Sequence, residues 1–217
     1  MNYLTSNVNS RIMLKQLPNI LTLGRLVLTL VFLVMILLAP RYYADGEKPF
    51  PGFLDVAFIL FVIAGLTDIA DGIAARRLHV TSKFGRMVDP LADKILVCGA
   101  FICFAIIGQP KLFGLSPGTL AVIHWSVLGV LIAREAYVTI LRHMAEARGI
   151  NFAATKSGKI KMFLQSFAIG TVIIKMAHVQ TAAWGNWFAA ITFALMLAVT
   201  IFSGIRATQR PHGQKTT

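Results

Sequence analysis

Six long apolar stretches, separated by short polar connections, dominate this chain of 217 residues. Hydrophobic residue types make up 56% of the sequence and charged types only 14%, whereas a soluble domain carries about 25% charged residues. A hydrocarbon core about 30 Å thick is crossed by about 20 residues of helix. The pattern therefore predicts an all-α membrane protein with six transmembrane helices rather than a soluble enzyme. The predicted spans are Ile20–Leu38, Leu54–Ala75, Val88–Ile107, Leu120–Leu141, Lys159–Met176 and Trp184–Phe202.

Polar and basic segments flank the spans. Arg11 and Lys15 lie in a mixed segment over residues 1–16, which predicts a short interfacial helix along Asn2–Gln16. Residues 17–205 then form one six-helix domain, and residues 206–217 form a basic tail. A signal peptide is the alternative for the first apolar stretch, but the run exceeds the apolar region of about 7–15 residues in such peptides.

The distribution of Lys and Arg sets the orientation. One side of the predicted spans collects the N-terminal segment, Arg76–Arg86, Arg142–Lys161 and the tail. The other side collects only Arg41, Lys48, Lys111 and Lys175. Because basic loops stay in the cytoplasm, we expect a multi-pass protein of the cytoplasmic (inner) membrane with both termini in the cytoplasm. The net charge of +12 is then explained by a membrane surface, and no nucleic-acid partner is expected.

Acidic residues concentrate at the end of the second span and the start of the third, where Asp68–Asp93 holds four of the chain's nine. Asp68 and Asp71 are spaced i,i+3 and Asp89 and Asp93 i,i+4, so on helices each pair shares a face. Carboxylates at the end of an apolar span are costly unless compensated, and by default they mark a functional site. Four of them at two meeting helix ends would repel one another, and hard divalent cations such as Mg²⁺ or Mn²⁺ would relieve that repulsion.

Two small residues and a basic residue lie close to these acids in the sequence. Gly72 and Ala75 leave room for a ligand to approach the backbone, and Arg76 suits an anionic oxygen. The alternative is that the acids only form ion pairs with the basic residues nearby, namely Arg76, Arg77, Lys83, Arg86 and Lys94. Ordinary loops do not place acids inside helix ends, which favours a functional site.

The full pattern is Asp68-x2-Asp71-Gly72-x2-Ala75-Arg76-x8-Gly85-x3-Asp89-x3-Asp93. At every fixed position it matches the signature of the CDP-alcohol phosphotransferases, so the chain resembles that family. The resemblance implies a membrane enzyme of phospholipid biosynthesis that binds two Mg²⁺ or Mn²⁺ ions and forms a homodimer.

The resemblance also implies roles for single residues. Asp68, Asp71 and Asp89 would be metal ligands, and Asp93 a fourth ligand or the general base. Asp89 and Asp93 are both candidates for the catalytic carboxylate, and sequence does not separate them. The positions implied to hold CDP-diacylglycerol are Asn19, Gly72, Ala75, Arg76, Ser82 and Gly85. Asn19 belongs to an opening segment with Thr22 and Arg25 that is similar to the family's, and a plain helix N-cap is its other interpretation.

Basic residues in the second half of the chain form the candidate site for the acceptor, the alcohol substrate that would receive the transferred group. Arg134 and Arg142 are eight residues apart, near one face of a helix. An arginine inside a span is expensive without an anion, and Glu135 is the only acid nearby. An acceptor phosphate would give Arg134, Arg142 and Lys159 a reason to converge. Lys156 and Lys161 instead fit anchors for anionic lipid head groups.

Ala133-Arg134-Glu135, Leu141-Arg142 and Gly158-Lys159-Ile160-Lys161 are similar to phosphatidylglycerophosphate synthases, although Met162 and Lys156-Ser157 depart from the pattern. The implied reaction transfers a phosphatidyl group from CDP-diacylglycerol to glycerol 3-phosphate and releases CMP. A cardiolipin synthase of the same family, with phosphatidylglycerol as acceptor, is the enzymatic alternative. A divalent-cation channel or transporter is the alternative of another class, although such sites usually ring a pore or lie near the bilayer midplane. Beyond Gln165 the last two spans are expected to add only hydrophobicity.

Overall fold

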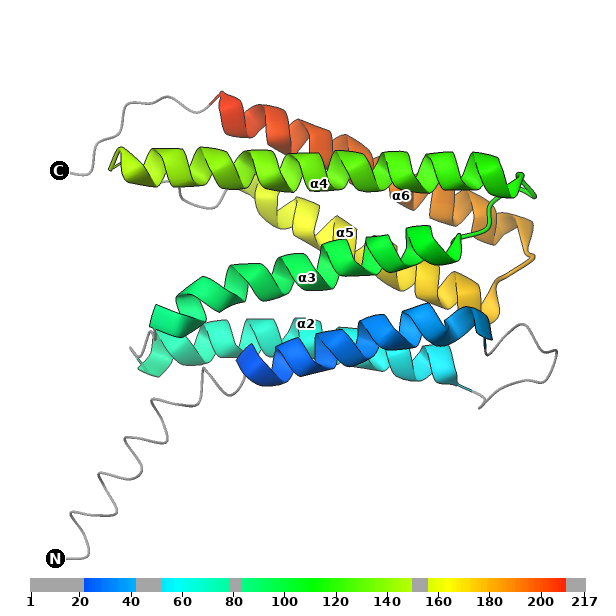
Figure 1. Ribbon diagram of the computed structural model, residues 1–217, viewed down its shortest axis with the longest axis horizontal. Helices are drawn as coiled ribbons and strands as arrows, with labels where there is room; N and C mark the ends of the chain where they lie inside the picture. The colour runs from blue at the N-terminus through cyan, green and yellow to red at the C-terminus, as the bar shows by residue number, and fades with distance from the viewer. Residues whose placement is uncertain (1–21, 42–51, 79–82, 150–155, 210–217) are drawn as a thin grey trace, which may run out of the picture. The chain divides into compact units, whose positions relative to one another are not determined.

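Helices make up all the regular structure in the described part of the chain (Figure 1). The computed structural model describes residues 22–41, 52–78, 83–149 and 156–209, and their side chains except those of residues 68–90, 156 and 157. The helices are Thr22–Arg41, which has no label in the figure, α2 (Phe53–Leu78), α3 (Lys83–Ile107), α4 (Pro117–Ala147), α5 (Lys156–His178) and α6 (Ala183–Thr208). The predicted all-α fold is confirmed, whereas the predicted interfacial helix Asn2–Gln16 lies outside the described residues.

The helices extend beyond the predicted spans, and the start of α3 is one example. This helix begins at Lys83 rather than at Val88, so Pro90 lies inside the helix rather than in its first turn. A proline inside a helix removes one hydrogen bond and costs about 3 kcal/mol. Membrane helices accept this cost more readily, because neighbouring groups satisfy the freed carbonyl. The helical register therefore runs without a break through both aspartates of α3.

Both ends of α4 carry recognisable capping signals, one that starts the helix and one that ends it. Ser116 is the N-cap, and its Oγ accepts a hydrogen bond from the backbone N–H of Thr119 at 3.2 Å. Gly149, with φ of 69°, follows the last turn, where only glycine adopts a left-handed conformation at little cost. The 31 residues of α4 extend for about 46 Å at 1.5 Å per residue, which exceeds a hydrocarbon core of about 30 Å.

The chain divides within α3 into two compact units, Met1–Ala100 and Phe101–Thr217. In the first unit, Phe32 of the first helix packs on Phe61 of α2 with ring centroids 5.5 Å apart. Gly99 of α3 approaches the first helix so closely that an added Cβ would lie 2.8 Å from Leu33 Cδ1. These contacts fix the first helix against both α2 and α3.

The first helix reverses the pattern of a soluble amphipathic helix. Its polar side chains point inward, since Thr22, Arg25 and Thr29 are at most 1% exposed. Its outer face is apolar, with exposed residues Leu23, Val27, Leu30, Val31, Val34 and Leu37. An apolar exterior around a partly polar interior is expected where lipid surrounds the helix.

The second unit contains α4, α5, α6 and the end of α3. Helix α6 packs against both α4 and α5, and its ring of Phe193 meets Phe101 of α3 edge to face at 6.0 Å. The inner face of α6 is lined by small and polar residues together with one methionine: Gly185, Ala189, Thr192, Met196, Thr200 and Ser203. Small residues let helices approach closely in membranes, so α6 is the central helix of this unit.

Four helices in the described part are long and apolar enough to cross a membrane. They are Thr22–Arg41, Pro117–Ala147, Gly158–His178 and Ala183–Thr208. The apolar segment Phe53–Thr67 of α2 is shorter. The chain is therefore a helical membrane protein.

Candidate active site

The acidic segment is carried by two consecutive helices of the first unit. Asp68 and Asp71 lie in the C-terminal half of α2, and Asp89 and Asp93 lie in the N-terminal half of α3. Because only residues 79–82 separate these helices, the end of α2 and the start of α3 lie at the same end of the unit (Figure 1). The helical spacing assumed for each pair is confirmed.

The other predicted residues of this segment are placed by helix only. Gly72, Ala75 and Arg76 follow the two aspartates on α2, and Gly85 precedes those on α3. Asn19 and Ser82 lie outside the described residues, as do the side chains of Asp68, Asp71 and Asp89. Among the described side chains no three acids, histidines or cysteines gather as a metal site, so the four-aspartate metal site stays a prediction.

Asp93 is the one predicted carboxylate whose side chain is described, and it pairs with Arg25 of the first helix. Arg25 Nη1 donates to Asp93 Oδ1 at 3.0 Å. The arginine side chain is 1% exposed and the aspartate side chain 30% exposed. A charged hydrogen bond of this kind stabilises the buried arginine and fixes one carboxylate oxygen of Asp93. The opening segment of the chain therefore reaches the acidic segment, as its resemblance to the family implied.

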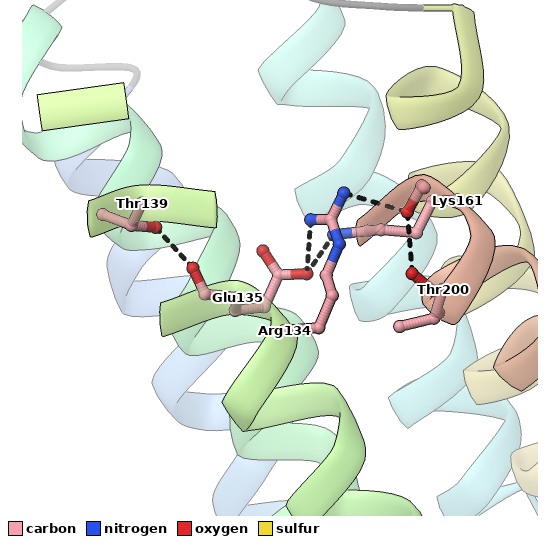
Figure 2. A network of polar contacts seen from close by, with 6 residues as sticks. Arg134, Glu135, Thr139, Lys161 and Thr200 are labelled. Carbon is pink, nitrogen blue, oxygen red and sulfur yellow. Dashed lines mark hydrogen bonds and ion pairs between the residues drawn. The ribbon is translucent and has the colours of Figure 1, made fainter. Parts of the chain in front are cut away.

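A second group of charges lies in the second unit, and we call Arg134, Glu135, Lys161 and Ser203 the basic cluster (Figure 2). Arg134 Nη1 donates to Glu135 Oε1 at 3.2 Å, and Arg134 Nη2 donates to Ser203 Oγ at 3.0 Å. Lys161 Nζ donates to the same Glu135 oxygen. The cluster thus joins α4, α5 and α6 through one carboxylate and one hydroxyl.

The charged side chains of the basic cluster are largely buried. The side chains of Arg134, Glu135 and Lys161 are 12%, 17% and 6% exposed. Arg134 and Lys161 both contact the same Glu135 oxygen. In addition, Arg134 Nε is buried and has no hydrogen-bond partner among the described residues. A buried guanidinium nitrogen of this kind is suited to an anionic ligand.

The structure changes the assignment of the basic residues. Arg134 holds the predicted interior position, but Arg142 and Lys159 are exposed, and within the described residues neither bonds to Arg134. Lys161 occupies the interior instead, so the prediction that it anchors lipid head groups was wrong. Residues two apart on a helix point in nearly opposite directions, and only one of Lys159 and Lys161 can face inward. The convergence of Arg134, Arg142 and Lys159 on an acceptor phosphate stays a prediction.

Ser203 is the functional-site residue that the sequence analysis missed. It lies on α6, a segment expected to add only hydrophobicity, yet it is 3% exposed and contacts Arg134. The available signal was the recurrence of Thr192, Thr200 and Ser203 on one face of an apolar helix. A buried polar stripe needs polar partners, and here Arg134 is one of them.

Two polar constellations on an otherwise lipid-compatible helical scaffold define the class of the protein. One is an acidic helix–connection–helix with a buried arginine, and the other is the largely buried basic cluster of α4, α5 and α6. Charged groups buried in such a scaffold are typical of a helical membrane protein with a functional site.

The family assignment follows from comparison with known proteins. The family model described as CDP-alcohol phosphatidyltransferase matches residues 15–202, so the chain belongs to the CDP-alcohol phosphatidyltransferase family. The match covers both the acidic segment and nearly all of the basic cluster. The resemblance drawn from the sequence is confirmed.

Named relatives align over most of their length. The chain is 31% identical over 201 residues to a "Probable phosphatidylglycerophosphate synthase" of Mycobacterium tuberculosis, covering 93% of this chain and 84% of the relative. It is 35% identical over 191 residues to a "CDP-diacylglycerol--glycerol-3-phosphate 3-phosphatidyltransferase" of Bacillus subtilis, covering 87% and 91%. A Rickettsia typhi protein with the latter name is 31% identical over 162 residues, covering 74% and 78%.

Proposed function

We propose that this protein transfers the phosphatidyl group of CDP-diacylglycerol to sn-glycerol 3-phosphate, giving phosphatidylglycerophosphate and CMP. The observation that carries the proposal is the alignment, over most of the chain, with relatives named for this reaction. The enzyme belongs to phospholipid biosynthesis, and its substrates are CDP-diacylglycerol and the acceptor alcohol.

In this reaction the 1-hydroxyl oxygen of glycerol 3-phosphate forms a bond to the phosphorus that carries the diacylglycerol. The bond from that phosphorus to the CMP oxygen breaks, and CMP leaves with the electron pair. The hydroxyl proton passes to a carboxylate, for which Asp89 and Asp93 are the two candidates. Arg25 fixes one oxygen of Asp93, which orients this carboxylate for proton transfer or for binding a ligand.

The acidic segment is the proposed metal site. Four carboxylates on two helices provide the hard oxygen donors that Mg²⁺ and Mn²⁺ prefer, and the helical spacing of each pair supports a shared face. Asp68, Asp71, Asp89 and Asp93 would hold two ions, which when bound neutralise charge on the diphosphate and on the leaving oxygen. Gly72, Ala75, Arg76, Ser82, Gly85 and Asn19 are the proposed contacts of CDP-diacylglycerol.

The basic cluster is the proposed site of the acceptor phosphate. Arg134 and Lys161 would bind its oxygens, and Arg142 and Lys159, exposed on the same helices, would attract the anion toward them. Supporting this role, Arg134 is largely buried and its Nε has no partner among the described residues.

The membrane topology is proposed to have six spans. Helices α2 and α3 contain 26 and 25 residues, enough for the two spans beyond the four candidates, since about 20 residues cross a bilayer. The Lys and Arg bias supports a cytoplasmic acidic segment and cytoplasmic termini in the inner membrane. The family resemblance supports a homodimer.

The test of the function compares acceptors in detergent with labelled CDP-diacylglycerol. We expect CMP release with glycerol 3-phosphate, dependence on added Mg²⁺ or Mn²⁺, and little release with phosphatidylglycerol. Turnover with phosphatidylglycerol but not glycerol 3-phosphate would identify a cardiolipin synthase. Cation flux in vesicles without any CMP release would favour the channel or transporter.

A variant tests the proposed acceptor role of the basic cluster separately from binding of CDP-diacylglycerol. Arg134→Ala should raise the KM for glycerol 3-phosphate by about 10- to 100-fold, because a hydrogen-bonded charge contributes about 1.5–3 kcal/mol. The KM for CDP-diacylglycerol should stay within about twofold. If only the KM for CDP-diacylglycerol rose, the assignment of the basic cluster to the acceptor would be wrong.

A further inference from the structure

Two adjacent residues of α6, Ser203 and Gly204, contact Arg134 and form what we call the α6 seat. We propose that the α6 seat positions the Arg134 guanidinium and thereby sets the affinity for the acceptor phosphate. This inference rests on the proposed function, because it assigns Arg134 to the acceptor. The seat residues themselves are positioning residues.

Ser203 presents a fixed hydrogen-bond acceptor to the arginine. Its Oγ donates its single proton to the backbone oxygen of Thr200 at 2.9 Å. The remaining lone pairs of Oγ can only accept, and one accepts from Arg134 Nη2 at 3.0 Å. Because Ser203 is 3% exposed, it does not exchange this partner for bulk water. The serine therefore defines where Nη2 lies.

Gly204 leaves space for the aliphatic stem of the same side chain. A Cβ added at Gly204 would lie 3.3 Å from Arg134 Cγ, closer than ordinary van der Waals contact. The stem of the arginine therefore lies against the glycine backbone. A larger residue would push the stem, and with it the guanidinium, away from α6.

Glu135 completes the arrangement from the other side. It accepts from Arg134 Nη1 at 3.2 Å, while Ser203 holds Nη2. Two terminal nitrogens held in two directions fix the plane of the guanidinium. Planar, two-point recognition of a phosphate depends on that plane. Loss of the seat should therefore weaken binding of the acceptor without altering the chemical step.

The experiment measures steady-state kinetics of the full-length enzyme in detergent, varying each substrate at saturating levels of the other. Ser203→Ala and Gly204→Ala are each expected to raise the KM for glycerol 3-phosphate by about 5- to 50-fold. Both kcat and the KM for CDP-diacylglycerol should stay within about twofold. Ser203→Thr keeps the hydroxyl and should recover most of the affinity.

Matched controls lie on α4. Ser126 is exposed, so Ser126→Ala controls for loss of a hydroxyl away from Arg134. A Cβ at Gly129 would meet nothing within 4 Å, so Gly129→Ala controls for the effect of alanine on a helix. Both variants should match the wild type. In an Arg134→Ala background, Ser203→Ala should cause no further rise in KM, because both act through one contact.

The outcomes separate the two proposals. If Arg134→Ala leaves the KM for glycerol 3-phosphate unchanged, the acceptor role of the basic cluster fails. If Arg134→Ala raises it but both seat variants stay within twofold, the α6 seat is overturned and the function stands. A fall in kcat alone would also overturn the seat. If Gly204→Ala is not recovered folded, Ser203→Ala decides, because it removes one oxygen and adds no bulk.

Discussion

The ion pair between Arg25 and Asp93 joins the first helix to α3 through charges in an apolar setting. The arginine is 1% exposed, and removing one partner of a buried pair is costly because the other charge stays behind. Sixty-eight positions separate the two residues along the chain, so spacing alone could not pair them. Their pairing is seen only in the folded structure.

Asp93→Asn should reduce CMP release by at least about 100-fold, whether Asp93 is the base or a metal ligand, because the amide neither takes a proton nor carries charge. The variant should still fold, since asparagine has the same shape and its oxygen can still accept from Arg25. Losing the charge opposite the buried arginine should lower its unfolding temperature. CMP release measures the loss of activity, and gel filtration checks that the variant is folded. Activity within tenfold of wild type would remove Asp93 from the chemistry.

Arg25→Gln should lower both stability and activity. The variant leaves Asp93, whose side chain is 30% exposed, without this hydrogen bond, at a cost of about 1.5–3 kcal/mol of stability for a bond to a charged group. Arg25→Lys should lose less, because a charge remains although the fixed donor geometry is lost. In thermal unfolding in detergent, we expect the wild type to have the highest midpoint, Arg25→Lys a lower one and Arg25→Gln the lowest. Equal midpoints for all three would show that the pair is not stabilising.

At the scale of helices, sequence patterns identified the elements better than their ends. The Ser116-Pro117 start of α4 and its Gly149 stop were readable signals, yet hydropathy placed the boundaries inside them. Lys159 and Lys161 show a second limit. Their charge was obvious, but which one faces α4 depends on the rotation of α5, and that is set by packing.

The turn between α5 and α6 depends on glycine at position 185. An added Cβ there would lie 2.5 Å from Val179 Cγ1, and the β-branched valine has few rotamers with which to move away. Gly185→Ala should therefore destabilise the protein by about 1–3 kcal/mol through overpacking. Gly129→Ala is the comparison, since alanine favours a helix and meets nothing there. The unfolding temperature of Gly185→Ala should lie below that of Gly129→Ala. A Gly185→Ala midpoint at or above that of the wild type would contradict the packing argument.

At the scale of the whole molecule, hydropathy and charge predicted a helical membrane protein and the motif predicted its family. Both predictions rest on local sequence signals, namely apolar runs and fixed residue spacings. What lay beyond them was the pairing of distant residues: Arg25 with Asp93, and Arg134 with Ser203. Such contacts depend on how helices pack, and no spacing along one helix encodes that.

Exposed aromatic side chains gather at the end of the second unit where α6 begins. Trp184 and Trp187 are 65% and 62% exposed, and Phe113 of the α3–α4 connection meets Trp187 with ring centroids 5.0 Å apart. Tryptophans of this kind settle at the level of lipid head groups. Trp125 lies eight residues after the first residue of α4, about 12 Å further along the helix axis, and is 53% exposed.

These positions predict different depths in a bilayer. In vesicles, a variant with Trp125 alone should be quenched most by lipids brominated deep in the acyl chain. Variants with Trp184 or Trp187 alone should be quenched most by bromine near the head groups. Replacing the other tryptophans by phenylalanine keeps the aromatic contacts, and activity in each variant checks that the fold is retained. The same depth for all three would mean that α4 and α6 do not cross the bilayer as spans that start at this end.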